Sequence, residues 1–452
     1  MKDKERFRST TESVCPECLR RVDAARVAEG DTVYLEKRCP EHGEFRTIIW
    51  RGEPAYDTWI RPRITVPPRM VTRGVERGCP FDCGICSEHR QDACLVLLEV
   101  TRRCNLRCAF CYADAGSGKE DPGLPEIEGW YRRLLEAGVS YNVQLSGGEP
   151  TLRDDLPEII EMGRGLGLEF IQVNTNGLRI AREPGFLERL QRAGLSSVFL
   201  QFDGTEDAIY QKIRGESLLA DKLKAVDRCA VLGIGVVLVP TLVRGVNLDN
   251  IGDIIDFARQ RVPAVRAVQF QPVSFFGRYP QAPADSDRVT LPEVVRMIEE
   301  QTGGKVRGEN LSPPGWENPA CSFYGSFVVM PEGRLMPLTH PGSRTCCQDE
   351  REGPEAARRT VKFMARYWSA QPQETGVPIP IGQKDSLDIF LERVKTHTLV
   401  ISGMGFQDAW NLDLDRLRDC CIHVVAGDGL LVPFCAYNLT DRQGRPLYRR
   451  GG

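Results

Sequence analysis

The chain has 452 residues, of which 41% are hydrophobic and 27% charged, and its formal net charge is −3. This length predicts two or three domains, and with a near-neutral charge nothing favours a general nucleic-acid or anionic-membrane partner, so we expect no nucleic-acid partner. The longest apolar run, 230–243, is too short to span a bilayer, and the first residues lack the apolar stretch of a signal peptide, so we expect no transmembrane segment and a cytoplasmic location.

Residues 1–60 form the first predicted module, a small metal-binding ribbon. The chain contains seventeen cysteines, and without a secretory signal such groups indicate metal or redox sites rather than disulfides. The knuckles Cys-Pro-Glu-Cys and Cys-Pro-Glu-His flank a strand-like stretch, a tetrahedral pattern that suits zinc or a rubredoxin-like iron. A distant cysteine in place of the histidine, or free thiols in a reducing cytosol, are the alternatives. The candidate ligands are Cys15, Cys18, Cys39 and His42.

Residues 61–94 are rich in Pro and Arg and contain a Cys-x3-Cys-x2-Cys triplet, Cys79, Cys83 and Cys86. No strand-like run precedes this triplet, and no Gly-Gly-Glu of its own follows it. We therefore assign it to an auxiliary [4Fe-4S] cluster. Cys94 is the candidate fourth ligand; the alternative is that Cys94 is merely the first buried residue of the next strand.

Strands and amphipathic helices alternate over residues 95–303. Such alternation gives right-handed βαβ crossovers and a parallel sheet, so we predict an α/β fold with a partial (β/α)6 barrel. Helical stretches include 127–137, 156–165 and 218–232. The strand-like runs are 95–100, 141–145, 169–174, 197–202, 235–243 and 267–273.

A second Cys-x3-Cys-x2-Cys triplet, Cys104, Cys108 and Cys111, follows the first of these strands. A fully protein-ligated [4Fe-4S] cube uses four cysteines, so three leave one iron open to a substrate or cofactor. Ligand sites of α/β folds lie at the carboxyl ends of strands. The next strand ends in Ser-Gly-Gly-Glu-Pro, in which two glycines allow close backbone approach to a ligand and a carboxylate follows. These residues are Gly147, Gly148 and Glu149.

Residues 304–452 are predicted to form an α+β extension that caps the barrel, with hairpins at 327–338 and 422–434. Cys421 and Cys435 are candidate metal ligands there, and buried strand cysteines are the alternative. Cys229, in a helical stretch, is predicted to belong to the core. The spacing assigns no role to Cys321, Cys346, Cys347 and Cys420.

The triplet at 104–111, the aromatic Tyr112 after it and Gly-Gly-Glu-Pro together resemble the signature of the radical S-adenosylmethionine (SAM) enzymes over about 95–273. The resemblance implies the partial barrel, a [4Fe-4S] cluster on the three cysteines and an open iron that chelates SAM. One electron then cleaves SAM to a 5′-deoxyadenosyl radical, which implies a reducing partner such as flavodoxin or ferredoxin. A structural zinc knot is the alternative.

The resemblance also implies SAM-positioning roles at later strand ends. In the family the position of Asn174 and Asn176 faces the SAM ribose, and an arginine placed like Arg214 pairs with the SAM carboxylate in bidentate geometry. A simple Asx turn and a surface arginine are the respective alternatives. The remaining members of the predicted cofactor-binding set are Tyr112, Gly147, Gly148 and Glu149.

The order of the motifs resembles one subgroup, the tetraether lipid synthases once described as class D methyltransferases. The likeness rests on the two N-terminal knuckles, both triplets and the late Val-Pro-Phe-Cys-Ala-Tyr-Asn at 432–438. It implies several metal centres, a small-molecule or lipid substrate, and hydrogen abstraction followed by carbon–carbon bond formation or alkylation.

Two other hypotheses remain open at this stage. Cys420, Cys421 and His423 partly resemble arsinothricin-forming radical enzymes, which implies transfer of the 3-amino-3-carboxypropyl group of SAM to arsenic. The chain could instead be a non-catalytic electron-transfer protein with several clusters, a hypothesis that gives Gly-Gly-Glu-Pro no role.

Overall fold

The computed structural model describes residues 8–449 apart from 62–64, 117–119, 137–140, 316, 340–367 and 370–385. The N-terminal ribbon is a four-stranded antiparallel sheet in the order β1-β2-β3-β4, followed by the short helix α1 (Tyr56–Trp59). Alternate residues of β3 are buried, as expected for a strand with one face on a core. The strands are β1 (Arg8–Val14), β2 (Arg21–Glu29), β3 (Thr32–Cys39) and β4 (Gly43–Arg51).

The barrel sheet contains the six predicted strands, each pairing in parallel with the next. Their ends lie within two residues of the prediction, except that the fifth run divides into β9 and the short β10 (Thr241–Leu242). These strands are almost continuously buried, because helices or side chains cover both faces. They are β5 (Leu95–Thr101), β6 (Asn142–Gly147), β7 (Ile171–Thr175), β8 (Ser197–Gln201), β9 (Gly235–Val239) and β11 (Val265–Pro272).

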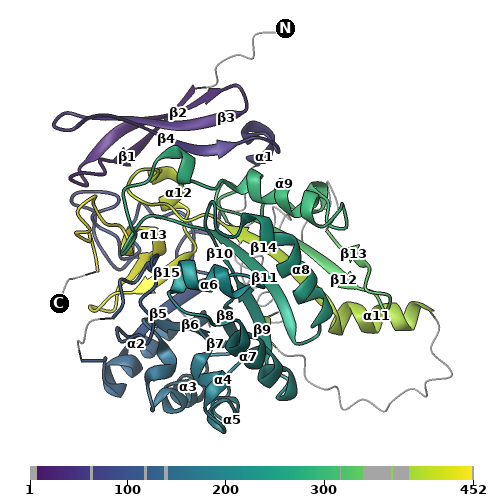
Figure 1. Ribbon diagram of the computed structural model, residues 1–452. Coiled ribbons are helices and arrows are strands. Elements are labelled where there is room, and N and C mark those ends of the chain that lie inside the picture. Colours follow the sequence, from purple (N-terminus) through teal and green to yellow (C-terminus); the bar gives the residue numbers. More distant parts are fainter. Residues whose placement is uncertain are drawn as a thin grey trace.

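Helices cover the outer face of this sheet (Figure 1). In α8 the buried residues recur at Ile251, Ile254, Ile255 and Ala258, the spacing of an amphipathic helix with one apolar face. The helices are α2 (Leu124–Glu136), α3 (Leu156–Gly165), α4 (Leu178–Arg182), α5 (Phe186–Arg192), α6 (Asp207–Arg214), α7 (Leu219–Val231), α8 (Ile251–Gln260) and α9 (Leu291–Gln301). Short 3-10 turns are η1 (Pro150–Leu152), η2 (Leu248–Asn250), η3 (Asp285–Asp287) and η4 (Gly308–Asn310).

The C-terminal extension, called the tail from here on, forms both predicted hairpins. Its strands also extend the barrel sheet at both edges. β14 pairs in parallel with β11, and β15 pairs in parallel with β5. The sheet order is β13-β12-β14-β11-β9-β8-β7-β6-β5-β15-β16. The predicted α/β fold with a partial barrel, a ribbon and a C-terminal extension is confirmed. The tail elements are β12 (Ser322–Val329), β13 (Leu335–Pro337), α11 (Ser386–Thr396), β14 (Thr398–Met404), α12 (Leu414–Arg418), β15 (Ile422–Val425), β16 (Leu431–Pro433) and α13 (Phe434–Tyr437).

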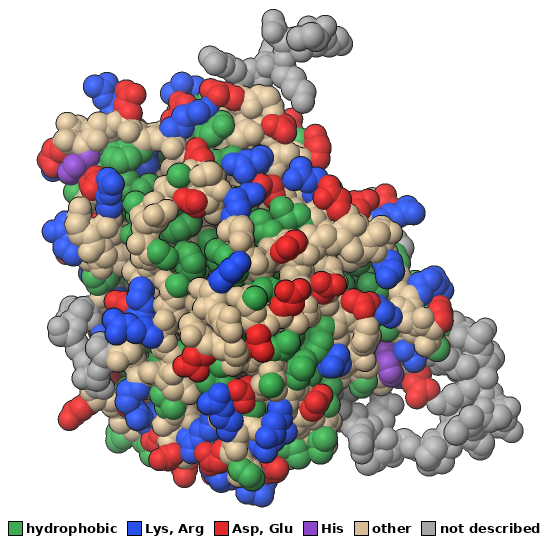
Figure 2. All heavy atoms as spheres, in the orientation of Figure 1, with side chains coloured by type: hydrophobic (Ala, Val, Ile, Leu, Met, Phe, Trp, Pro, Cys, Tyr) green, Lys and Arg blue, Asp and Glu red, His purple; other side chains and the backbone are tan. Residues whose placement is uncertain are grey.

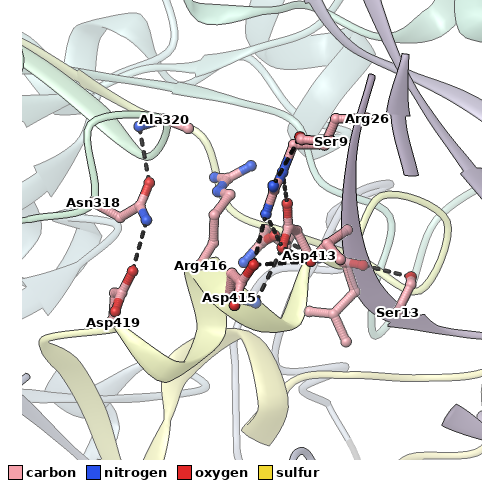
Figure 3. A network of polar contacts seen from close by, with 12 residues as sticks. Ser9, Ser13, Arg26, Asn318, Ala320, Asp413, Asp415, Arg416 and Asp419 are labelled. Carbon is pink, nitrogen blue, oxygen red and sulfur yellow. Dashed lines mark hydrogen bonds and ion pairs between the residues drawn. The ribbon is translucent and has the colours of Figure 1, made fainter. Parts of the chain in front are cut away.

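The ribbon rests on the tail through a network of polar contacts (Figure 3). Arg26 of β2 donates to both carboxylate oxygens of Asp413, at 2.6 and 3.0 Å, and to Asp415 at 3.1 Å. The Ser13 hydroxyl donates to the carbonyl oxygen of Leu412 at 2.5 Å. The first and last thirds of the chain are thus joined by buried and partly buried hydrogen bonds.

Lys and Arg side chains alternate with Asp and Glu over the face drawn in Figure 2, in agreement with the small net charge. Among the described residues, no helix has the length and apolar character needed to cross a membrane.

Candidate functional site

The carboxyl ends of the barrel strands surround a cavity of about 200 Å³. The tail closes part of it, because Met404, Phe406, Ile422 and Phe434 line the same space. Every residue predicted for the SAM site lies in its wall, so the structure brings together motifs separated by more than a hundred positions. These are Cys104, Cys108, Cys111, Tyr112, Gly147, Gly148, Glu149, Asn174, Asn176 and Arg214.

The two glycines after β6 hold the start of the Cys loop, defined here as residues 102–116. The N–H groups of Gly148 and Glu149 donate to the carbonyl oxygens of Thr101 and Arg103, each at 2.8 Å. Gly147 has φ +124°, and a Cβ on Gly147 or Gly148 would overlap those same carbonyl oxygens. The two glycines therefore allow their own backbone to lie close to the backbone at the start of the Cys loop.

Glu149 is buried and links β6 to β7. Its Oε1 accepts from the Thr151 hydroxyl and the Thr175 hydroxyl, both at 2.6 Å, and from the Thr151 N–H at 3.1 Å. Its Oε2 accepts from the Asn176 N–H at 2.7 Å. The predicted SAM-binding carboxylate thus already has four protein donors, and its observed role is to order the turn after β7.

The two asparagines of that turn differ. Asn176 Oδ1 accepts from the Leu178 N–H at 3.0 Å and its Nδ2 donates to Asn105 at 2.8 Å, so the Asx-turn alternative describes its side chain. Asn174 Nδ2 lies 3.4 Å from the Ser146 hydroxyl, which also contacts the Tyr112 hydroxyl at 2.7 Å. Asn174, Ser146 and Tyr112 therefore present a connected polar edge to the cavity.

Arg214 differs from the prediction in its partner. Its Nε and Nη2 donate to the two oxygens of Asp203, each at 2.7 Å, and Nη2 also donates to the Thr241 hydroxyl at 3.0 Å. Burial alone would lower the pKa of this guanidinium, but the charges and hydrogen bonds of Asp203 and Cys108 together raise it. The bidentate geometry expected for the SAM carboxylate is met here by Asp203, and the surface-arginine alternative is wrong because Arg214 is buried.

The cavity wall fits a cluster held at three corners. Among the described residues that line it there is no fourth cysteine and no histidine. Burial raises the pKa of Cys104 to about 12 and also raises the pKa of Cys111, so these thiols stay protonated until a metal displaces the protons. Three cysteine donors beside an open space match the predicted [4Fe-4S] site with one free iron.

The cavity also contains residues that the sequence prediction missed. Phe406 and Phe434 pack with ring centroids 4.5 Å apart, and Phe434 lies 5.5 Å from Tyr112. Gln269 and Gln271, on the inward side of β11, present amides that no described residue hydrogen-bonds. Polar residues alternate with apolar ones in β11, and this pattern could have indicated that the two amides face the cavity. No local sequence feature indicates the apolar tail wall, which is the part of the cavity lined by Met404, Phe406, Ile422 and Phe434.

The four predicted ribbon ligands converge. The sulfur atoms of Cys15, Cys18 and Cys39 and a ring nitrogen of His42 all lie within 4.8 Å of one another. His42 Nδ1 is 3.4 Å from Cys39 Sγ and 3.6 Å from Cys15 Sγ. Three cysteines and one histidine form a standard donor set for structural zinc.

The upstream triplet is buried in a loop that Asp82 orders. The Asp82 carboxylate accepts from three successive backbone N–H groups, of Glu76, Arg77 and Gly78, at 2.5 to 2.8 Å. The nearby Cys79 thiol and burial together raise the pKa of Cys83 well above its ordinary value. Cys79, Cys83 and Cys86 are all buried.

Cys94, the predicted fourth ligand of that triplet, has another neighbour. Its Sγ lies 3.0 Å from Cys421 Sγ, and its N–H donates to the Cys421 carbonyl at 2.8 Å. The adjacent Cys420 instead has its Sγ 3.2 Å from the Ile422 carbonyl oxygen. The two thiols of the Cys420–Cys421 pair therefore have different partners.

The other tail cysteines are dispersed. Cys435 Sγ accepts from the Gln407 N–H at 3.3 Å, and Cys321 Sγ accepts from Arg416 at 3.3 Å. Cys229 is fully buried in α7, as predicted. Cys346 and Cys347 lie outside the described residues.

Comparison with known proteins agrees with this architecture. Residues 98–258 match the Radical SAM superfamily, and residues 7–51 match the HMPTM N-terminal zinc ribbon domain. The chain is 34% identical, over 96% of its own length and 94% of the relative, to 7,8-dihydro-6-hydroxymethylpterin dimethyltransferase of Methanocaldococcus jannaschii. A probable GTP 3′,8-cyclase of Methanothermobacter thermautotrophicus is 28% identical over 40% of this chain and 59% of that protein.

Among solved structures, Streptococcus suis SuiB is similar with a TM-score of 0.39 and 15% identity, covering 47% of each chain. The match to the M. jannaschii dimethyltransferase spans nearly the whole of both sequences and includes the ribbon as well as the barrel. The chain therefore belongs to the radical SAM superfamily and, within it, to the family of that dimethyltransferase.

Proposed function

We propose that this radical SAM enzyme forms a carbon–carbon bond at an unactivated carbon of a substrate with substantial apolar surface. One observation carries the proposal: the apolar tail wall and the three cysteines line the same cavity. An alkyl group resting on Phe406 and Phe434 would therefore lie in the same cavity as the three cysteines. Membership of an enzyme family excludes the non-catalytic electron-carrier hypothesis.

Different residues that line the cavity would have different roles in this reaction. Cys104, Cys108 and Cys111 would hold the [4Fe-4S] cluster, which when bound supplies the electron that cleaves SAM to a 5′-deoxyadenosyl radical. Asn174 and Tyr112 would offer hydrogen bonds at the polar edge of the cavity. The apolar wall would exclude water and stray hydrogen donors from the radical.

Two further metal sites, in the ribbon and at the upstream triplet, belong to the proposed enzyme. We assign zinc to the ribbon, on the Cys15, Cys18, Cys39 and His42 donor set, and an auxiliary [4Fe-4S] cluster to the buried upstream triplet. Cys94 and Cys435 remain candidate ligands, as does Cys421. A low-potential flavodoxin or ferredoxin in the cytoplasm would supply the electrons.

A second candidate function is methylation of a dihydropterin. The unengaged amides of Gln269 and Gln271 favour it, because a flat nitrogen-rich ring offers matching donors and acceptors. The name of the M. jannaschii relative points to the same substrate class.

The test is anaerobic reconstitution with iron and sulfide, followed by incubation with SAM, dithionite and one candidate substrate. An alkyl ether lipid is compared with 7,8-dihydro-6-hydroxymethylpterin, each deuterated at the expected carbon. We expect mass spectrometry to find deuterium in 5′-deoxyadenosine with the lipid.

Deuterium transfer or methylation only with the pterin would replace the first candidate by the second. With arsenite present, 5′-methylthioadenosine as the sole SAM product would instead support the arsenic branch. Absence of any SAM cleavage from a fully loaded protein would contradict all three. Gln269→Ala with Gln271→Ala is the matched variant: it should weaken pterin binding and leave the lipid reaction intact.

A further inference from the structure

The segment that follows β11 forms backbone hydrogen bonds with the third cysteine of the Cys loop. The N–H of Cys111 donates to the Arg278 carbonyl, and the N–H of Arg278 donates back to the Cys111 carbonyl, each at 2.9 Å. The preceding Gly277 has φ +66°, and a Cβ there would overlap the carbonyl oxygens of Cys111 and Tyr112. The backbone at 277–278 is therefore fixed against the loop.

The Arg278 side chain forms further hydrogen bonds with the loop. Its Nε donates to the Cys108 carbonyl at 3.0 Å. Its Nη1 donates to the Ala115 carbonyl and to Asp114 Oδ1, each at 3.1 Å. One guanidinium thus spans from the second cysteine to beyond the third.

Three arginines from outside the Cys loop, among the described residues, lie beside it, and their counter-charges differ. Arg214 is paired with the fully buried Asp203. Arg449, which donates to the Ala113 carbonyl, is paired at 2.6 Å with Glu99, whose side chain is only 9% exposed. Within the part of the chain that the structure describes, the acidic partner of Arg278 is Asp114, whose side chain is 61% exposed and therefore screened by water. Arg278 is the arginine of this set whose positive charge stays largely uncompensated beside the cysteines.

We propose that Arg278 is a positioning residue that fixes the Cys loop and raises the reduction potential of the cluster held there. A nearby positive charge stabilises the reduced cluster, which carries one more electron than the oxidised cluster. The electron comes from the flavodoxin- or ferredoxin-class reductant, and no bond is made or broken in this step. The inference rests on the proposed cluster at Cys104, Cys108 and Cys111.

The experiment is an anaerobic redox titration followed by electron paramagnetic resonance, with the SAM-dependent change of the signal identifying this cluster. Arg278→Gln removes the charge and should lower the midpoint potential, so that the reduced fraction at a fixed potential falls by about tenfold, equivalent to about 59 mV for a one-electron couple. Arg278→Lys keeps the charge and should retain the potential while iron occupancy falls, because lysine cannot bridge three acceptors.

Two further variants keep the test decisive if Arg278→Gln fails to load iron. Asp114→Asn removes the partial counter-charge on an exposed residue whose φ of +44° asparagine tolerates, and it should raise the potential. Arg132→Gln, at an exposed pair on α2, is the charge-matched control and should change nothing.

Equal potentials in the wild type and the loaded Arg278→Gln and Asp114→Asn proteins would overturn the inference while leaving the proposed function intact. Absence of a SAM-responsive cluster in the wild type would instead overturn the proposed function itself.

Discussion

Cys108 is the buried member of the three cysteines that line the cavity, whereas Cys104 and Cys111 are partly exposed. Its replacement by alanine should abolish 5′-deoxyadenosine formation and remove one cluster equivalent of iron and sulfide, because two thiolates cannot retain the cube. Cys229→Ala is the matched control: this buried thiol lies in α7, away from the cavity wall, so we expect a loss of about 1 kcal/mol of stability and full cluster content. Unchanged SAM cleavage by Cys108→Ala would refute the cluster assignment.

Lys222 is a fully buried ammonium beneath the turn after β7. It donates to the Asn176 carbonyl at 2.5 Å and to Gln201 Oε1 at 3.1 Å. Burial lowers its pKa to about 8, despite the opposing charge of Asp203. The unfolded chain, with an ordinary lysine pKa near 10.4, therefore binds more protons than the folded protein between about pH 8 and 10.4.

The sign of the pH effect follows from that difference. This group should make the free energy of unfolding rise by up to about 3 kcal/mol from pH 8 to pH 10.4. Lys222→Met lacks the titration, so the wild-type curve should climb relative to the variant across this window in urea denaturation. Parallel curves would show that the lysine titrates normally.

At the scale of elements, the Ser-Gly-Gly-Glu-Pro segment joins two other parts of the site. Its N–H groups bind the start of the Cys loop, and its carboxylate binds the turn after β7. A disturbance in this short segment therefore reaches two neighbouring strand ends. The segment acts as a scaffold for the cavity.

Gly147→Ala tests this role of the segment. At φ +124° an L-residue is strained, and the added Cβ would overlap the Thr101 carbonyl oxygen, so we expect a loss of about 3 kcal/mol and weaker iron retention. Gly129→Ala, in the exposed middle of α2 with open space around it, is the control and should stabilise the protein by about 0.5 kcal/mol. Denaturation midpoints and iron content measure both, and equal stability of the two variants would contradict the scaffold role.

At the scale of the whole molecule, sequence reasoning succeeded where periodicity and spacing are local. The six barrel strands and the Cys loop at the end of the first strand carry their own patterns, because strand and turn preferences act over a few residues. The pairing of β15 with β5 joins residues more than 300 positions apart and leaves no local trace. For the same reason, the tail residues that line the cavity and the contacts of Arg278 with the Cys loop emerged only from the folded chain.

The ribbon and the tail meet through a largely buried ion pair that links the metal-binding ribbon to the cavity wall. Arg26 and Asp413 have side chains 14% and 2% exposed, and α12, which begins next to Asp413, leads to β15 and the cavity residue Ile422. Ordering of the ribbon should therefore help to order the wall.

Arg26→Met should cost about 3 kcal/mol, because it leaves the Asp413 carboxylate buried without its cation. Arg20→Met, at an ion pair whose side chains are 53% and 55% exposed, is the control and should cost less than about 1 kcal/mol. If the contact orders the tail, Arg26→Met should also make the tail more sensitive to limited proteolysis while the zinc content stays unchanged, since the four metal ligands are untouched. Loss of zinc without tail cleavage would mean that this contact supports the ribbon alone and that the cavity wall is stable without it.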